Sequence, residues 1–144
     1  MRFLQDRRGD IFAYFSVLMV FLMLPLSSVA VDIVRGMYVR GHLHTATDAA
    51  CQAAADALDA PLFRDTGRRQ INGSLARSQA GRVFSATLAD ANQVQFSPSL
   101  SVRIPNHTTA QCTASATVAR LIPGTPRMEV VTFTESQMRV SSLN

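Results

Sequence analysis

The stretch "RRGDIFAYFSVLMVFLMLPLSSVAVDIVRGMYVR", from Arg7 to Arg40, decides the architecture of the chain. Between Ile11 and Val31 it runs for 21 residues without a charge. A helix of that length spans roughly 31 Å, about the thickness of the hydrocarbon core of a bilayer. A core helix of a soluble domain is shorter and carries a regular polar stripe. The stretch therefore predicts a membrane-inserting helix over residues 11–34, with Pro25 tolerated inside it.

The segments on either side of this helix set its expected orientation. Arginines lie on both sides of the apolar run, and the positive-inside rule favours a cytoplasmic N-terminus by a small margin. Residues 1–10 are too few for a domain, so they are expected to be a cytoplasmic tail. Residues 35–144 are long enough for one small domain and contain no second apolar run, which predicts a single extracytoplasmic domain.

Composition and motifs argue against several classes of function. The net charge of +4 is spread along the chain, and the densest basic patch, "RDTGRR" at Arg64–Arg69, includes an aspartate and no aromatic residue. Without tryptophan or interleaved aromatics, a nucleic-acid partner is not expected. His42 and His44 point to different faces of a helix, which disfavours a metal site. No catalytic triad or phosphate-binding loop is visible, so we expect no enzyme, no small-molecule substrate and no cofactor.

The region after Asp32 predicts two helices. An alanine-rich segment at about 36–60 carries one helical stripe, and Pro61 is expected to end it. Gly36 and Gly41 suggest a flexible joint just outside the membrane. A second helix is expected at about 68–89. The packing stripe of the first helix consists of Val39, Leu43, Ala46, Ala50, Ala53 and Ala57.

The pattern changes to alternation with period two within about 93–142. The segments "VQFSPSLSVRI", "AQCTASATVARLI" and "MEVVTFTESQMRV" predict three strands joined by short turns, an antiparallel meander with Pro98 on an edge strand or bulge. The expected fold class is therefore α+β: a transmembrane helix that continues into an alanine-rich helix, a second helix and a small antiparallel sheet.

Cys51 and Cys112 both fall in the expected extracytoplasmic domain. Thiols commonly pair outside the cytoplasm, and a bridge closing a loop of this length would stabilise the fold by roughly 4 kcal/mol. Two separately buried side chains would explain the same residues. Spacing alone leaves both alternatives open.

The first 58 residues or so resemble the TadE/TadG-like proteins of Flp (Tad) pilus assembly. The resemblance is carried by Arg8-Gly9, Leu24-Pro25, Ala30-Val31-Asp32, Arg35, Tyr38, Arg40, Leu43 and the alanines around Thr47-Asp48-Ala49-Ala50. It implies a short TadG-like member with a pilin-like arrangement of helix and sheet. It also implies a structural component in the inner (cytoplasmic) membrane, whose partners are the membrane and other pilus-assembly proteins.

Two details of the signature leave processing open. The resemblance places a leader-cleavage junction between Gly9 and Asp10, but Tyr14 stands where cleaved members have glutamate. Ala30 also ends a small-x-small motif after an apolar region, which is typical of signal-peptide cleavage. The alternative function is therefore a secreted soluble binding domain that is released after Ala30.

Asp32 has two readings in the sequence. A carboxylate just outside the apolar run resists entry into the bilayer and so marks the membrane edge. Arg35 lies one turn later and could pair with it, or Asp32 could form a salt bridge with the stem of a neighbouring subunit.

Overall fold

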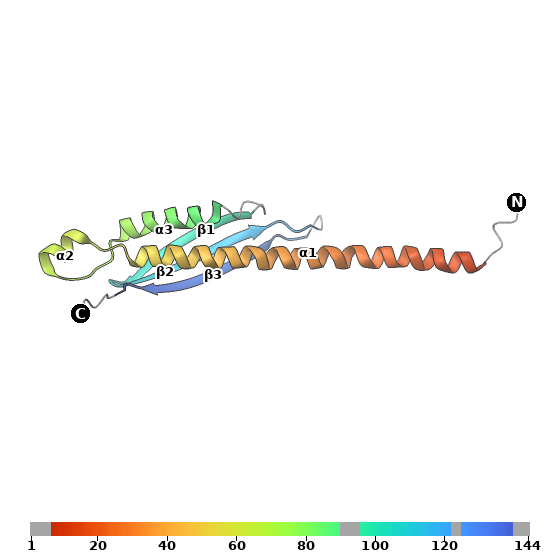
Figure 1. Cartoon of the computed structure of the whole chain (residues 1–144), viewed down its shortest axis with the longest axis horizontal. Helices are drawn as coiled ribbons and strands as arrows, with labels where there is room; N and C mark the ends of the chain where they lie inside the picture. Colours follow the sequence, from red (N-terminus) through yellow and green to blue (C-terminus); the bar gives the residue numbers. More distant parts are fainter. Residues whose placement is uncertain (1–6, 90–95, 122–124, 140–144) are drawn as a thin grey trace.

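The computed structural model describes residues 7–89, 96–121 and 125–139, with the backbone alone at residues 7–10. Figure 1 shows an elongated molecule in which half of one long helix projects alone and the other half lies on a sheet. The α+β class expected from the sequence is confirmed. Within the described residues the elements are, in chain order, α1 (Arg7–Ala55), α2 (Ala60–Thr66), α3 (Gly73–Ala89), β1 (Phe96–Asn106), β2 (Thr109–Val118) and β3 (Met128–Gln137).

Helix α1 is one continuous element of 49 residues, roughly 74 Å long. We call its residues 11–34 the stem, and the described part of residues 35–139 the head. The helix passes through Pro25, and it stays helical at Gly36 and Gly41, where a flexible joint is expected from the sequence. Gly36 has a packing role instead, because a Cβ atom there would lie 2.6 Å from the Met128 methyl group. The glycine lets the first residue of β3 approach the helix closely.

The sheet is an antiparallel meander in the order β1-β2-β3. Val102 lies opposite Cys112, which in turn lies opposite Thr134 on the third strand. Pro98 sits on β1, an edge strand, as its missing N–H group predicts. Side chains along β2 alternate between buried and exposed positions, so one face of the sheet points into the core.

The helices cover that one face. Helix α1 packs on β2 and β3, and α3 lies beside α1 and contacts β1 (Figure 1). Small side chains dominate the contact, which lets helix and sheet approach closely. The opposite face of the sheet is open, and Val131 and Phe133 on β3 are 55% and 58% exposed there. The largest fully buried side chains are Leu43, Val39, Val118, Thr47, Cys51 and Cys112.

The segment between α1 and α3 differs from the sequence expectation. Helix α1 ends at Ala55, and Pro61, expected as a stop, lies in the first turn of the short helix α2, where a missing N–H group costs nothing. Asp59 caps that helix by accepting a hydrogen bond from the Leu62 N–H group at 3.4 Å. Helix α3 then begins at Gly73 and not at 68, because Asn72 accepts the first free N–H groups.

Candidate functional site: the stem and its junction with the sheet

The stem exposes a large apolar surface on all sides. Phe12 and Phe21 are 75% and 77% exposed, and the neighbouring leucines, valines and methionines are also uncovered. By length and composition, α1 is the one helix among the described residues that is long and apolar enough to cross a membrane. A signal sequence near the N-terminus has the same properties. Apolar surface of this extent calls for a cover of lipid or protein.

Asp32 connects the stem to the connection between β2 and β3. Its Oδ1 atom accepts a hydrogen bond of 3.0 Å from the backbone N–H group of Leu121. No ion pair joins Asp32 to Arg35, which lies half-buried one turn further on, in the part of the chain that the structure describes. Ala30 and Val31, which precede Asp32 in the family signature, are exposed on α1. The carboxylate therefore has a structural partner within its own chain.

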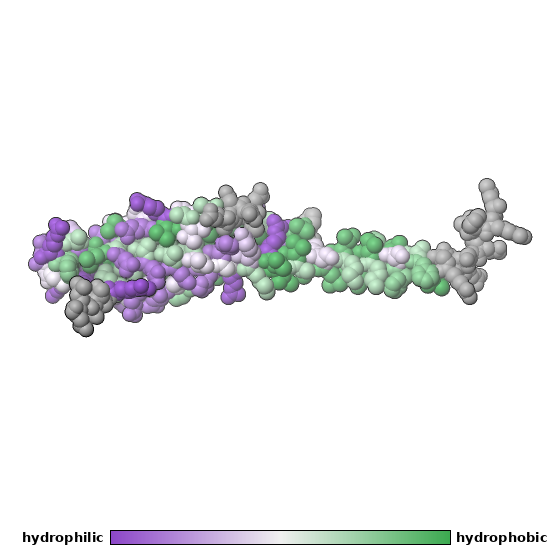
Figure 2. All heavy atoms as spheres, viewed as in Figure 1, coloured by the Kyte–Doolittle hydropathy of each residue, from purple (hydrophilic) through white to green (hydrophobic). Residues whose placement is uncertain are grey.

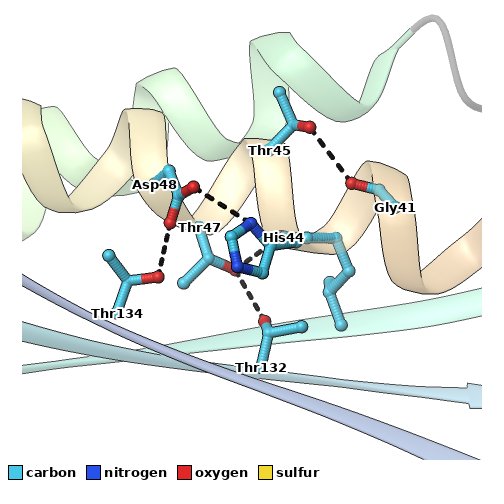
Figure 3. A network of polar contacts seen from close by, with 8 residues as sticks. Gly41, His44, Thr45, Thr47, Asp48, Thr132 and Thr134 are labelled. Atoms are coloured by element: carbon cyan, nitrogen blue, oxygen red, sulfur yellow. Dashed lines mark hydrogen bonds and ion pairs between the residues drawn. The ribbon is translucent and has the colours of Figure 1, made fainter.

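Polar side chains bind α1 to β3 further along the helix (Figure 3). The hydroxyl oxygens of Thr47 and Thr132 lie 2.9 Å apart, and Thr47 also donates to the Leu43 carbonyl oxygen at 2.6 Å. At the next residue of the helix, Asp48 Oδ1 accepts a hydrogen bond of 2.5 Å from the Thr134 hydroxyl, and His44 Nδ1 lies 3.0 Å from the other oxygen of that carboxylate. The Thr47–Thr132 and Asp48–Thr134 bonds join two adjacent residues of the helix to two successive inward-facing residues of β3. Together they fix how far the helix is advanced along the strand.

The two thiols meet in the core between α1 and β2. Cys51 and Cys112 are both buried and both free, and they lie close enough for each thiol to influence the ionisation of the other. Cys51 Sγ also donates to the carbonyl oxygens of Ala110 at 3.3 Å and Thr134 at 3.4 Å. Burial raises the pKa of Cys51, and burial together with the neighbouring thiol raises the pKa of Cys112 further. Both sulfurs are therefore protonated at neutral pH and poor nucleophiles.

The stripe residues divide according to where α1 ends. The first four are fully buried against the sheet and α3. Ala53 is only half-buried, and its neighbour Ala54 takes the fully buried position. Ala57 is buried but lies beyond the helix. The fully buried members on α1 are Val39, Leu43, Ala46 and Ala50.

The remaining candidate residues, two histidines and the expected leader junction, lie apart from one another on α1. His42 stacks on Tyr38 with ring centroids 4.3 Å apart, and His44 faces Asp48, so the two histidines do not converge. Among the residues the structure describes, no three His, Cys, Asp or Glu side chains are grouped to hold a metal ion. Gly9 and Asp10, the expected leader junction, lie in the first turn of α1, where side chains fall outside the described residues.

Sequence reasoning missed the partner of Asp32 and the polar contacts between α1 and β3. The polar groups themselves are visible in the sequence: Thr132 and Thr134 fall on one face of the strand, and Thr47 and Asp48 are neighbours on the helix. However, nothing in the local pattern pairs residues that lie about 85 positions apart. Asp32 bonds to the backbone N–H group of Leu121, so the identity of the Leu121 side chain does not indicate this contact in the sequence.

Comparison with known proteins assigns the long helix to a family. Residues 9–57 match a family model described as "Putative Flp pilus-assembly TadE/G-like". No match to the chain is found among curated proteins or among solved structures. The matched residues coincide with α1, including the stem, Asp32 and the half that packs on the sheet. The long helix is therefore similar to the TadE/TadG-like region of Flp pilus-assembly proteins, and the resemblance predicted from the sequence is confirmed over these residues.

Proposed function

We propose that this protein is a membrane-anchored, non-catalytic structural or assembly component of a Flp (Tad) type pilus. The stem spans the inner membrane once, the N-terminal tail is cytoplasmic, and the head lies outside. In this role the chain needs no cofactor and no small-molecule substrate. Its partners are the bilayer and other pilus-assembly proteins.

The continuity of α1 is the observation that carries this proposal. The same helix supplies an exposed apolar stem and the central element of the head's core. Because the outer half of α1 is packed into the head, the head cannot move along or away from the apolar stem. The two therefore act as one rigid unit. The family match covers this same helix, which supports a role in pilus assembly for the combined stem and head.

The proposed partner contacts involve two uncovered surfaces. The stem offers apolar side chains all around its axis, suitable for lipid and for other transmembrane helices. The open face of the sheet offers mostly serine and threonine, with Val131 and Phe133 as exposed apolar side chains. A docking contact between pilus components outside the membrane would use this second surface.

One observation favours a second candidate, a soluble binding domain released by cleavage after Ala30. The buried hydrophobic residues of the described core begin at Val39, so a product that starts at Val31 would keep that core intact. It would also keep Asp32 and its bond to Leu121. Such a product would lose the N-terminal tail and the stem up to Ala30.

Intact mass of the protein isolated from cells separates these alternatives. We expect the membrane fraction to retain the protein after carbonate washing, with a mass that corresponds to the full chain or to cleavage after Gly9. A soluble form that begins at Val31 would overturn the anchor. A matched pair of variants links the anchor to pilus assembly: Leu18→Arg places a charge in the stem and should abolish retention and piliation, whereas Leu18→Ile should preserve both.

A further inference from the structure

Leu121, which follows β2, is held at a defined level of the stem. Its hydrogen bond to Asp32 fixes it beside the residue that directly follows the uncharged run. Because the run is about as long as a bilayer core is thick, Asp32 marks the level of the bilayer interface when the stem is inserted. Burial along the stem begins even earlier, at Ser28, one turn before Asp32. The head therefore reaches down to the end of the apolar run.

Apolar side chains are exposed at this level. Leu121 is 53% exposed although its backbone is tied to the helix. Ile33 and Met37, which follow Asp32 on α1, are also exposed. Figure 2 shows apolar surface along the stem and again at the adjoining end of the head, with a narrow pale strip between the two. Apolar surface is thus present past the aspartate and on a second segment.

The same end of the head is cationic. Arg120 is exposed after β2, Arg127 before β3, and Arg40 on α1. Arg40 and Glu129 line a shallow groove of about 430 Å³ between α1 and the start of β3. With Arg35 included, four arginines and two acids, Asp32 and Glu129, lie at this end of the head. Asp32 already accepts a hydrogen bond from Leu121. Exposed arginine beside exposed leucine matches the phosphate and acyl layers of a phospholipid surface.

We propose that Arg120 and Leu121 after β2, together with Arg127 before β3, form a second bilayer contact: Leu121 enters the interfacial layer, and Arg120 and Arg127 bind anionic lipid headgroups. Asp32 positions this contact by holding the Leu121 backbone against the stem. The head then contacts the membrane surface directly. This inference rests on the proposed function, because it requires that the stem is inserted.

Tryptophan fluorescence tests the contact in the full-length protein, since the chain contains no tryptophan of its own. Three single variants, Leu121→Trp, Phe21→Trp and Phe133→Trp, are reconstituted into vesicles of phosphatidylcholine and phosphatidylglycerol with bromine on the acyl chains. Phe21 lies in the stem and Phe133 on the open face of the sheet, and Phe133 and Leu121 are similarly exposed. We expect quenching and a blue shift at positions 21 and 121, and neither at position 133.

The three positions separate the two proposals. Quenching at 21 without quenching at 121 would overturn the lipid contact while the anchor stands. Absence of quenching at 21 would overturn both. Equal quenching at 121 and 133 would mean that the head lies on the membrane without a specific seat, which also contradicts the inference.

A pair of Asp32 variants tests the positioning role. Asp32→Asn keeps an oxygen that can accept from the Leu121 N–H group, whereas Asp32→Ala removes it. In the Leu121→Trp background we expect Asp32→Asn to retain the quenching and Asp32→Ala to lose most of it, with position 21 unchanged in both. Equal quenching in the two variants would show that the bond to Asp32 does not position Leu121.

Discussion

The hydroxyl of Thr47 on α1 and that of Thr132 on β3 lie 2.9 Å apart in the core, joining residues 85 positions apart in the chain. Thr47 has a second partner, the Leu43 carbonyl oxygen, to which its hydroxyl donates. The proton in the bond between the threonines must therefore come from Thr132. Thr132 therefore donates its proton to Thr47 alone, whereas Thr47 donates its own proton to the Leu43 carbonyl oxygen.

This difference between the two hydroxyls predicts different costs for the two valine variants. Thr47→Val leaves the buried Thr132 hydroxyl without its partner and should destabilise the protein by about 1–3 kcal/mol. Thr132→Val leaves Thr47 bonded to Leu43 and should cost about 0.5–1.5 kcal/mol. Thermal unfolding of the full chain in detergent measures both. The double variant should be no worse than Thr47→Val, because no unpaired hydroxyl remains, and equal costs for the two single variants would contradict this proton assignment.

The alanines of α1 should respond to enlargement according to their burial. Ala50 is fully buried against the sheet, so Ala50→Leu should overpack the contact and cost about 1–3 kcal/mol. Ala53 is half-buried near the end of the helix, and Ala53→Leu should change stability by well under that amount. Thermal unfolding of both variants decides between them, with Ala54→Leu as a second fully buried position. A larger loss at Ala53 than at Ala50 would mean that the helix is rotated relative to the sheet.

The thiol pair should become a disulfide in an oxidising compartment. Cys51 and Cys112 already lie close together, and exchange with a disulfide-bearing oxidoreductase would join the sulfurs while the oxidant takes up two electrons and two protons. Non-reducing electrophoresis after thiol alkylation should show no free thiol in protein from cells. The oxidised protein should be more stable than the reduced one by up to roughly 4 kcal/mol. Ready labelling of both thiols in unfolded, unreduced protein would contradict the bridge.

In the reduced protein the same thiols should make stability fall at alkaline pH. Their folded-state pKa values are raised above the ordinary value of 9.0. The stabilisation is complete below that value and is lost as the pH rises above it, because the unfolded chain then releases protons that the folded chain keeps. The slope should reach at most about 1.4 kcal/mol per pH unit for each thiol.

Denaturant unfolding with reductant present, measured on both sides of the ordinary thiol pKa, tests this slope. The double variant Cys51→Ala/Cys112→Ala is the control, since it lacks both thiols and keeps every other residue of the chain. Its stability should fall less steeply with pH than that of the parent. Parallel curves would show that ionisation of the thiols does not contribute.

The main elements could be predicted from sequence because each has a strong periodic signal. The uncharged run and the stripe beginning at Val39 predict α1, and the alternating threonines and valines predict the sheet. Helix α2 could not be found in the same way, because Pro61 ends a helix and begins one equally well. The shift from Ala53 to Ala54 arises where α1 ends, and a stripe drawn at constant period cannot locate that end.

The candidate site was predicted in composition but not in its contacts. Asp32 stood out because of its place after the apolar run, yet its partner is a backbone group 89 residues away. The two cysteines stood out as a pair, but their proximity depends on the packing of α1 across β2. Both relationships follow from how helix and sheet are docked, which local sequence patterns do not encode.

The unbroken course of α1 from stem to head has an angular consequence. Because helical residues advance by about 100° each, the bearing of the sheet around the helix axis is set by the number of residues between the stem and Val39. A neighbouring transmembrane helix that binds one side of the stem therefore sets the direction in which the open face of the sheet points. Inserting a single residue after Val34 would swing that face by more than a quarter of a turn, leaving both the stem and the sheet chemically unchanged.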